Sequence, residues 1–557
     1  MAKKKITTSD ISSAEKILGI SYSSAEREQM VNNLESQILS AKIRRTKKLE
    51  NNVPMASLFD PRLPGFKMPL ASGVKIKSRR VPIPNNNEDI AFATVGEQGG
   101  WIMSGKITSR KLTEIYLDRI GRLQDKLECF AAVTKEQALA EADAMDALTC
   151  QEISLGPLHG IPYGLKDLFD TKDIKTGWGA EPYRDRVPEK DATVVGRLRA
   201  AGAVLLGKTT LGALAFNDIW YGGRTKNPWN LNEGSSGSSA GSASATAAGL
   251  CSFAIGTETL GSITSPSQRC GTTGLRPTFG RVSRFGGMSL CWSLDKVGPI
   301  CRCVEDTGIV LSVLNGHDEN DRFSIKAPFN FNNSKRIKDL VIGYLPEAFE
   351  EGASELDLAT LKVAKNLGVN VKKVELEDFP YMSLINILYA EAAAAFEHLT
   401  LSNEDDTLTR QDKEAWPNIF RKARFLSAVD HVQLDRLRYL VMKALDKLFK
   451  EVDILIGPFD TGPMLVASNF TGHPCLHLRA GFEYLATRGA TSFGSITSGI
   501  TSLKSEDLVK ENKFKVPHGI SLWGGLFEEE KILNFGMALE DALDVYKERP
   551  SLPIESC

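Results

Sequence analysis

The first hundred residues show a helical hydrophobic pattern followed by a stretch without one. Ser23 and Glu26 have the Ser-x-x-Glu spacing of a capping box, and apolar residues then recur at helical spacing: Met30, Val31, Leu34 and Ile38. Residues 53–97 are rich in Pro, Asn and Gly, which favours an extended connector. We therefore expect residues 1–100 to form a helical N-terminal extension and connector.

Beyond residue 100, helical patterns alternate with short apolar runs. Residues 108–148 are expected to be mostly helical, and a helix over 191–201 leads into the strand-like run Ala203–Leu206. Helix-then-strand alternation of this kind favours an α/β fold. The same pattern continues with amphipathic helices over 353–370 and 431–450 and a short buried strand at Ile454–Ile456.

One stretch near the C-terminus departs from this pattern. Residues 489–505 are rich in Ser, Thr and Gly and contain little that could build a core, which predicts a surface insertion at about 484–516. We assign residues 101–557 as a whole to one α/β domain, and the motifs described below mark this domain as catalytic.

Composition and charge exclude several classes of function. The 557 residues carry a formal net charge of -1, so no global field attracts nucleic acid or an anionic membrane. The basic run from Lys42 to Lys48 is expected to be a solvated helix end. No segment approaches the roughly 20 apolar residues of a membrane span, and the basic start has no apolar run behind it as a secretory signal would.

Cysteine and histidine usage favours a cytoplasmic protein without a metal. The nine cysteines are scattered, and the close pair Cys301 and Cys303 lacks a second pair to complete a metal site. The seven histidines show no His-x-x-x-His spacing. We therefore expect reduced thiols, a cytoplasmic location and no metal.

The most unusual local feature is the glycine-serine tract from Gly234 to Gly249. Its first half is Gly/Ser-rich and its second half is Ala-rich, as in a loop that runs into the N-terminus of a helix. A short apolar strand, Ser252–Ile255, then enters a second Gly/Ser-rich turn at 256–266. Backbone N–H groups in such turns suit an anion or a developing oxyanion, so the tract predicts a site and not a flexible linker.

These segments resemble the motifs of the amidase-signature family. The tract 234–249 is similar to its Gly-Gly-Ser-Ser-Gly-Gly-Ser-Ala segment, and 256–266 to Gly-Thr-Asp-Thr-Gly-Gly-Ser-Ile-Arg-x-Pro. Further segments match in order: Gly156 to Asp167, Gly207-Lys-Thr, Gly271 to Val282, Asn469 to Pro474 and the helix after Phe527. The family pattern matched by Gly271 to Val282 is Gly-x-x-Gly-Leu-Lys-Pro-Thr-x-Gly-Arg-Val, and Arg276 stands at its lysine position. The resemblance implies a large mixed β-sheet layered between helices, as in stand-alone serine amidases of bacterial type, which also resemble the A-subunit of the amidotransferases.

The resemblance further implies a catalytic triad. It places the nucleophile at Ser262, the relay serine at Ser238 after a cis peptide bond to Gly237, and the base at Lys166. A serine hydroxyl needs a base to become nucleophilic, and burial can lower the pKa of a lysine enough for it to act as one. The family-implied oxyanion donors are the backbone N–H groups of Thr259, Leu260, Gly261 and Ser262. No cofactor is implied.

Other residues compete for these roles or have plainer explanations. Ser236, Ser239 and Ser242 are alternatives to Ser238, and Ser265 and Ser267 to Ser262. Asp167 is expected to make a structural hydrogen bond. The resemblance suggests pocket walls at Trp178, Phe216, Asn217, Gly237 and Ser239, although core burial would equally explain Trp178 and Phe216. Residues 380–440 are expected to cover the entrance.

Three residues depart from the family pattern in the nucleophile turn. Leu260 stands where the family has glycine, Glu258 where it has aspartate, and Thr264 where it has arginine. Leucine does not reach positive φ cheaply. These departures argue against the tRNA-dependent amidotransferase subunit, and they leave open a catalytically silent member that acts as a binding or assembly protein.

A nucleotide-binding protein is a rival hypothesis. Gly202 to Thr209 fits the phosphate-loop pattern Gly-x-x-x-x-Gly-Lys-Thr. However, Ala203–Leu206 is apolar and strand-like, whereas a phosphate cradle needs that loop free of the core.

The sequence as a whole predicts an amidase that cleaves a small carboxamide to a carboxylate and ammonia or an amine. No nucleic-acid or membrane partner is expected, and a homodimer is left open.

Overall fold

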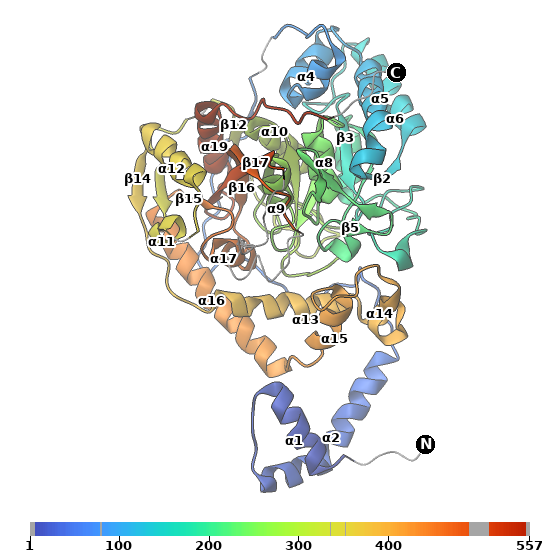
Figure 1. Cartoon of the computed structure of the whole chain (residues 1–557), viewed down its shortest axis with the longest axis vertical. Helices are drawn as coiled ribbons and strands as arrows, with labels where there is room; N and C mark the ends of the chain where they lie inside the picture. The colour runs from blue at the N-terminus through green and yellow to red at the C-terminus, as the bar shows by residue number, and fades with distance from the viewer. Residues whose placement is uncertain (1–5, 78–80, 335, 351, 490–511, 553–557) are drawn as a thin grey trace.

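A mixed β-sheet forms the centre of the computed structural model, which describes residues 6–77, 81–334, 336–350, 352–489 and 512–552 (Figure 1). Within these ranges the sheet has eleven strands, in the order β14-β13-β15-β17-β16-β10-β11-β9-β3-β4-β2. From one edge to the other they span Asn370–Lys373, Val341–Tyr344, Ile454–Pro458, Phe514–Gly524, Cys475–Leu485, Thr273–Arg276, Lys296–Cys301, Phe253–Glu258, Pro162–Lys166, Val204–Thr209 and Phe130–Val133.

The strands that carry the catalytic motifs are buried and parallel. β3 pairs in parallel with β4 on one side and with β9 on the other. Strands covered on both faces read as near-continuous apolar runs, as Ala203–Leu206 does. Because parallel strands end at the same edge of the sheet, Lys166 at the end of β3 lies near Glu258 at the end of β9.

Helices cover both faces of the sheet. At β10, Thr273 reaches Glu540 on α19, whereas a side chain at Gly274 would meet Ile263 and Ser267 around α9. The alternation along the strand therefore places α19 and α9 on opposite faces. Helices α3 to α12 and α19 are α3 Asn87–Phe92, α4 Val95–Met103, α5 Ser109–Leu127, α6 Lys135–Thr149, α7 Thr193–Ala200, α8 Ala240–Ala247, α9 Thr264–Cys270, α10 Val304–Leu314, α11 Pro346–Glu350, α12 Glu355–Asn366 and α19 Glu529–Leu543.

The remaining helices lie below the sheet in Figure 1. They are α13 Ile385–Ala395, α14 Glu397–Ser402, α15 Trp416–Ala423, α16 Ala428–Glu451 and α17 Met464–Phe470. Below them, α1 Thr8–Leu18 and α2 Ser24–Arg45 form a hairpin that projects from the body. Both helices begin with a capping box, at Thr7 and Ser23, and Arg44 pairs with Glu397 at 2.7 Å.

Short elements complete the fold. Three small sheets pair β1 Val74–Lys75 with β12 Phe331–Asn332, β5 Ile219–Trp220 with β6 Gly223–Arg224, and β7 Lys226–Asn227 with β8 Asn230–Gly234. Single 3-10 turns occur at Glu181–Tyr183, Ala213–Ala215, Tyr381–Leu384 and Glu404–Thr407. In the described ranges, no helix is long and apolar enough to span a membrane.

The structure corrects the prediction for the connector and confirms the one for the helical stretch that follows it. The connector predicted over 53–97 is not extended throughout, because α3 begins after the Asn86 cap and α4 after the capping box of Thr94 and Glu97. The prediction that residues 108–148 are mostly helical is confirmed by α5 and α6, with the short strand β2 between them.

The segment predicted as a surface insertion is bordered by paired strands. β16 extends to Leu485 and β17 begins at Phe514, and these two residues face each other in the ladder. The insertion predicted at about 484–516 thus starts and ends within strands, and residues 490–511 of it lie outside the described residues.

Candidate active site

Lys166 lies at the centre of a cluster of hydroxyl groups. Its Nζ donates hydrogen bonds to Ser238 Oγ at 2.9 Å, Ser239 Oγ at 2.9 Å and Thr257 Oγ1 at 2.8 Å. The side chain is fully buried. Burial lowers the pKa of the Lys166 ammonium well below its usual value, against the opposite effect of the Asp295 and Glu258 carboxylates.

Ser238 and Ser239 lie in the turn that leads into α8. The peptide bond between Gly237 and Ser238 is cis, as the resemblance implies. A Cβ at Gly237 would lie 1.9 Å from the Asn217 carbonyl oxygen, so only glycine fits this close approach. Ser239 Oγ donates to the Thr257 carbonyl at 3.1 Å and accepts from the Thr257 N–H at 3.1 Å.

The two serines therefore differ in how their hydroxyl groups are used. Ser239 Oγ has its proton and both acceptor positions engaged by Lys166 and Thr257. Within the described residues, Ser238 Oγ has Lys166 as its one hydrogen-bond partner. Only Ser238 has a proton free to exchange with another group.

Ser262 lies in the turn between β9 and α9, and 8% of its surface is exposed. Its carbonyl accepts a hydrogen bond from the Ser239 N–H at 3.1 Å, which ties the two serine turns together. Among the described contacts Ser262 Oγ has no hydrogen bond to Ser238; catalytic contacts often tighten only when substrate binds. In the same part of the chain, the N–H groups of Leu260, Gly261 and Ser262 donate to no acceptor.

The leucine in this turn is not a source of strain. Gly261 has a φ of +84°, whereas Leu260 is absent from the described residues with positive φ. The sequence required this turn to tolerate the side chain of Leu260, and the turn does so without a positive φ at that residue. The position that needs glycine is the next one, where the chain has kept it.

Glu258 is buried below the nucleophile turn. Its Oε2 accepts from the N–H groups of Ile263 and Thr264 at 2.9 and 3.0 Å and from Thr264 Oγ1 at 3.1 Å. Its Oε1 accepts from Arg276 at 2.7 Å and from Asn469 at 3.0 Å. Burial would raise the pKa of Glu258, but Arg276 and the Thr264 N–H lower it to about 2.

Thr259, on the other side of the turn, is held by a second carboxylate. Its Oγ1 donates to Asp295 Oδ1 at 2.6 Å. Asp295 Oδ2 accepts from the N–H groups of Leu290 and Cys291 at 2.8 and 3.0 Å. The residues expected to supply the oxyanion donors are thus flanked by two anchored carboxylates.

Two of the predicted pocket residues, Trp178 and Phe216, lie in aromatic clusters. Trp178 packs on Tyr183, with 4.5 Å between ring centroids, and Arg186 lies 4.5 Å over its ring. Phe216 packs on Trp416 at 5.2 Å, and Arg410 lies 5.0 Å over the Phe216 ring.

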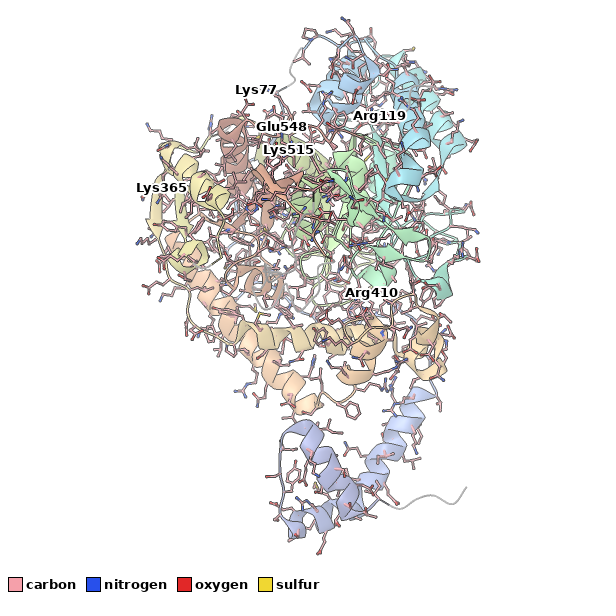
Figure 2. The ribbon with its side chains drawn as sticks, viewed as in Figure 1. Lys77, Arg119, Lys365, Arg410, Lys515 and Glu548 are labelled. Carbon is pink, nitrogen blue, oxygen red and sulfur yellow. The ribbon has the colours of Figure 1, made fainter. Side chains whose placement is uncertain are left out.

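These contacts also locate the segment predicted to cover the entrance. Trp416 Nε1 donates to the Leu214 carbonyl at 3.0 Å, directly beside Phe216. Figure 2 shows Arg410 at the boundary between the sheet body and the helices below it. Residues from the 380–440 segment therefore contact the loop that carries Phe216 and Asn217.

A small cavity adjoins the catalytic cluster. Its volume is about 20 Å³, and Thr257 and Thr259 line it beside apolar side chains that include Leu168, Ala215, Met288 and Leu290. A larger cavity of about 1010 Å³ lies around α4 and α19, and none of the predicted site residues lines it.

The phosphate-loop hypothesis is wrong. Residues Val204–Thr209 form β4 and are fully buried in the sheet. Lys208 Nζ donates to the Phe169 carbonyl at 2.8 Å and to Thr176 Oγ1 at 2.6 Å, and it lies 3.4 Å from Asp167 Oδ1. Its ammonium is therefore committed to the protein interior, where no nucleotide phosphate could reach it.

Asp167 makes hydrogen bonds to the loop that carries Trp178. Its Oδ2 accepts from the Gly177 N–H at 3.0 Å, and its carbonyl accepts from the Trp178 N–H at 3.2 Å. Burial raises the pKa of Asp167 to about 6, although Lys208 opposes this shift. Asp167 and Lys208 thus hold the Trp178 loop against the strand that carries Lys166.

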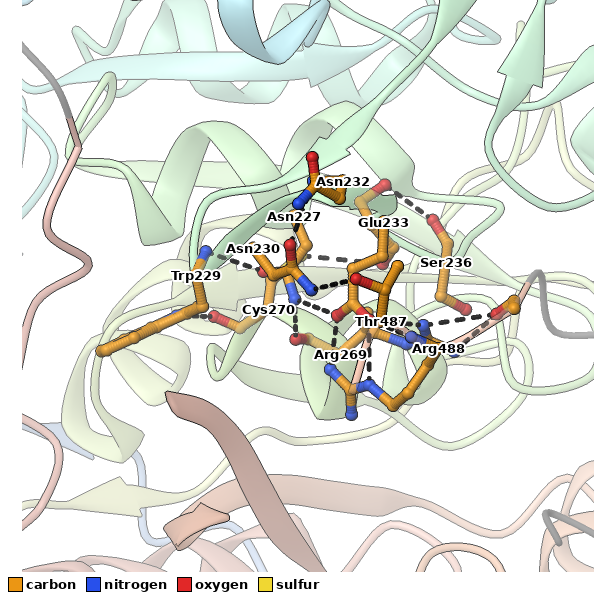
Figure 3. A network of polar contacts seen from close by, with 12 residues as sticks. Asn227, Trp229, Asn230, Asn232, Glu233, Ser236, Arg269, Cys270, Thr487 and Arg488 are labelled. Carbon is orange, nitrogen blue, oxygen red and sulfur yellow. Dashed lines mark hydrogen bonds and ion pairs between the residues drawn. The ribbon is translucent and has the colours of Figure 1, made fainter. Parts of the chain in front are cut away.

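A charged network holds the outer end of the glycine-serine tract (Figure 3). Glu233 pairs with Arg488 at 2.6 Å and lies 3.6 Å from Arg269, and it accepts from Asn227 at 2.7 Å. Asn230 of the same hairpin donates to Thr487 at 3.2 Å. The network links β8, α9 and the residues that follow β16.

Ser236 itself is part of the packing between the two turns. Its Oγ lies 2.7 Å from Ser265 Oγ, and its N–H donates to Asp218 Oδ2 at 3.0 Å. Ser242 bonds with Thr209 and the Ile255 carbonyl, away from Lys166. Of the competing serines, only Ser239 shares the lysine with Ser238.

Sequence reasoning missed four residues of this site. Thr257 lies within the 256–266 motif, and Arg276 and Asn469 lie in two of the other matching segments, so their positions were marked but their contacts were not. Asp295 had no signal in the sequence. In the described chain, no three His, Cys, Asp or Glu residues are placed to hold a metal ion.

Known proteins resemble this chain in sequence and in fold. The model of the Amidase family matches residues 111–533. The Glutamyl-tRNA(Gln) amidotransferase A-subunit of Desulfatibacillum aliphaticivorans is 30% identical over 492 residues, which cover 82% of this chain and 99% of that protein. The protein of the same name from Chromohalobacter salexigens is 34% identical over 442 residues, which cover 70% and 90% respectively.

Solved structures of amidases share the fold. The native peptide amidase of Stenotrophomonas maltophilia superposes with a TM-score of 0.68 at 25% identity, over 83% of this chain and 99% of that one. A bacterial aryl acylamidase has a TM-score of 0.69 at 20% identity, over 83% and 99%, a likeness that shows the fold alone.

Proposed function

Because the chain belongs to the amidase family, whose model matches most of its length, we propose that it hydrolyses the C–N bond of a carboxamide with Ser262 as nucleophile. The observation that carries this proposal is the environment of Lys166, a buried amine surrounded by three hydroxyl groups. Burial favours the neutral amine, which is the form able to accept a proton.

The hydrogen-bond pattern supports a direction for the proton transfer. A neutral amine has two N–H groups and one lone pair. Ser239 and Thr257 can accept the two N–H groups, because the proton of Ser239 is directed to the Thr257 carbonyl. In this neutral form the contact between Lys166 Nζ and Ser238 Oγ reverses its direction, and the lone pair of Lys166 accepts the proton of Ser238.

The reaction follows from this arrangement. Ser238 takes the proton of Ser262 as Ser262 Oγ attacks the substrate carbonyl carbon, and Ser238 passes its own proton to Lys166. The tetrahedral oxyanion accepts hydrogen bonds from the N–H groups of residues 259–262. When the C–N bond breaks, the relay returns the proton to the leaving nitrogen.

Deacylation uses the same groups. Water attacks the Ser262 ester, its proton passes through Ser238 to Lys166 and then back to Ser262 Oγ, and the carboxylate leaves. The products are a carboxylate and ammonia or an amine. The proposed substrate is a small-molecule amide. The described residues that line the site include no metal-ligand cluster.

Amide turnover and active-site labelling test the proposal together. Wild type, Ser262→Ala and Ser267→Ala would be compared for ammonia or amine release from aliphatic, aryl and peptide amides, and for labelling by a fluorophosphonate. Ser267 is a matched control because it is a buried serine of α9, the helix that follows Ser262, and its hydroxyl bonds within the fold, accepting from Thr272 at 3.1 Å. We expect Ser262→Ala alone to abolish both signals.

Two other functions give different outcomes. A catalytically silent binding protein would leave folded wild type without turnover and without label. The amidotransferase relatives raise a second candidate, in which the ammonia is delivered to an acceptor on a partner; tRNA-dependent consumption of ammonia would then exceed free release. A homodimer and a cytoplasmic location also remain predictions, which sedimentation and fractionation would test.

A further inference from the structure

The turn that carries Ser262 is anchored from below by one carboxylate. Glu258 Oε2 accepts three hydrogen bonds from the two residues that follow Ser262, namely from the Ile263 N–H and from the N–H and hydroxyl of Thr264. The nucleophile is therefore held between Gly261, which makes the turn, and two peptide groups fixed on Glu258.

Arg276 connects this carboxylate to a distant part of the chain. One guanidinium nitrogen donates to Glu258 Oε1 at 2.7 Å, and the other donates to Ser468 Oγ and the His473 carbonyl, both at 2.8 Å. Asn469 adds a bond to the same Oε1 at 3.0 Å. Glu258 and Arg276 are both fully buried, so their contacts are not weakened by solvent.

Each of the three residues of this anchor departs from the motifs that the chain resembles. Glutamate replaces aspartate at 258, threonine replaces arginine at 264, and arginine replaces lysine at 276. The change at 264 removes a cation. The change at 258 supplies a longer carboxylate, and the change at 276 supplies a forked cation. The guanidinium of Arg276 can bond Glu258 and α17 at the same time, whereas a lysine ammonium is a point charge.

We propose that Glu258, Thr264 and Arg276 form a positioning set. All three differ from the family motif, and together they keep Ser262 reactive without the arginine of that motif. This inference rests on the proposed function, because the reactive group it positions is the Ser262 nucleophile. None of the three residues touches the reacting atoms; they act through the backbone of residues 263 and 264.

If the three residues act as a set, the effect of substituting one of them depends on which residues stand at the other two positions. Glu258→Asp shortens the carboxylate and withdraws it from the Ile263 and Thr264 N–H groups. Thr264→Arg adds a second cation beside Arg276, and Arg276→Lys loses one arm of the bridge to α17. Each single variant leaves a buried group incompletely paired, whereas the triple variant restores the family combination.

The experiment compares the three single variants with the triple variant. We expect each single variant to lower kcat on the order of 10- to 100-fold with KM nearly unchanged, because the nucleophile and not the pocket is displaced. The triple variant should recover to within about tenfold of wild type. The fluorophosphonate labelling rate of Ser262 should follow the same order.

A second buried ion pair supplies the matched control. Arg281 and Glu529 lie 2.6 Å apart and are equally buried, and their other contacts are to Thr278, Asn315, Pro328 and Phe527, outside the nucleophile turn. Arg281→Lys should lower the thermal midpoint as much as Arg276→Lys does, while kcat and the labelling rate stay close to wild type. This separates positioning from a loss of stability.

The outcomes distinguish the positioning set from the proposed function. Single variants with unchanged kcat, or a triple variant slower than every single one, would overturn the positioning set while leaving the amidase intact. Wild type without turnover or label would contradict the proposed function. In that case thermal midpoints still test the set: recovery of stability in the triple variant supports it, and additive losses overturn it.

Discussion

The Lys166 amine donates to Ser238 and to Ser239 at the same distance, 2.9 Å, but only Ser239 is also bonded in both directions to the backbone of Thr257. The two adjacent hydroxyl groups thus have different freedom. Ser239 fixes the amine in place, and Ser238 can exchange its proton.

This difference predicts unequal effects of two alanine substitutions. Ser238→Ala should lower kcat by about 10²- to 10⁴-fold, as expected for loss of a general acid–base group. Ser239→Ala should cost less, because Thr257 still holds the amine. Steady-state kinetics on one amide would measure both, and an equal or larger loss for Ser239→Ala would reassign the relay.

The lowered pKa of Lys166 predicts the pH dependence of the reaction. Only the neutral amine accepts a proton, so kcat/KM should fall as the pH drops through the pKa of Lys166, at a pH well below that of an ordinary lysine. Lys166→Arg should lose turnover at every pH, because arginine stays charged. An acidic limb that persists in Lys166→Arg with residual activity would show that another group is titrating.

The close approach at Gly237 predicts a strong effect of one added methyl group. Gly237→Ala would place Cβ 1.9 Å from a backbone oxygen of Asn217, so the turn must shift and activity should be lost. Gly121→Ala is the control, because Gly121 lies within α5 with no described atom within 4 Å of the added Cβ. That variant should be stabilised by about 0.5–1 kcal/mol; thermal unfolding and turnover would be measured for both.

The raised pKa of Asp167 predicts a pH-dependent stability. The folded protein binds an extra proton between the ordinary pKa of 3.8 and the value of about 6, so wild type loses stability as the pH rises through this window. Asp167→Asn lacks this loss, which amounts to at most about 3 kcal/mol. The difference in thermal midpoint between the two proteins should therefore change in favour of the variant from about pH 4 to about pH 7. A difference that does not vary with pH would contradict the shift.

Much of the site was visible in the order of short motifs. The glycine-serine tract, the turn at 256–266 and the lysine segment each specify local structure, because glycine at 261 permits a left-handed turn and the Ala-rich run after 239 forms α8. The same motifs carried the resemblance from which the α/β fold with its large mixed sheet was expected, and this fold is confirmed.

Other features depended on contacts that no local pattern describes. Gly202 to Thr209 satisfies a phosphate-loop pattern, yet pairing with β3 and β2 makes it a buried strand. The helices α3 and α4 occur in a stretch expected to be extended, because Ile90, Val95 and Trp101 can be buried against the core. Burial of this kind overrides weak local preference.

The sequence by itself determined which residues could do the chemistry: a lysine at the end of a strand, two serine turns and the glycines that shape them. Only the tertiary structure decided how they work together. Parallel pairing of β3 with β9 brings Lys166 to Thr257, and burial lowers the pKa of its ammonium. The bridge from Glu258 through Arg276 to α17 joins residues about two hundred positions apart, and such contacts exist only once the chain has packed.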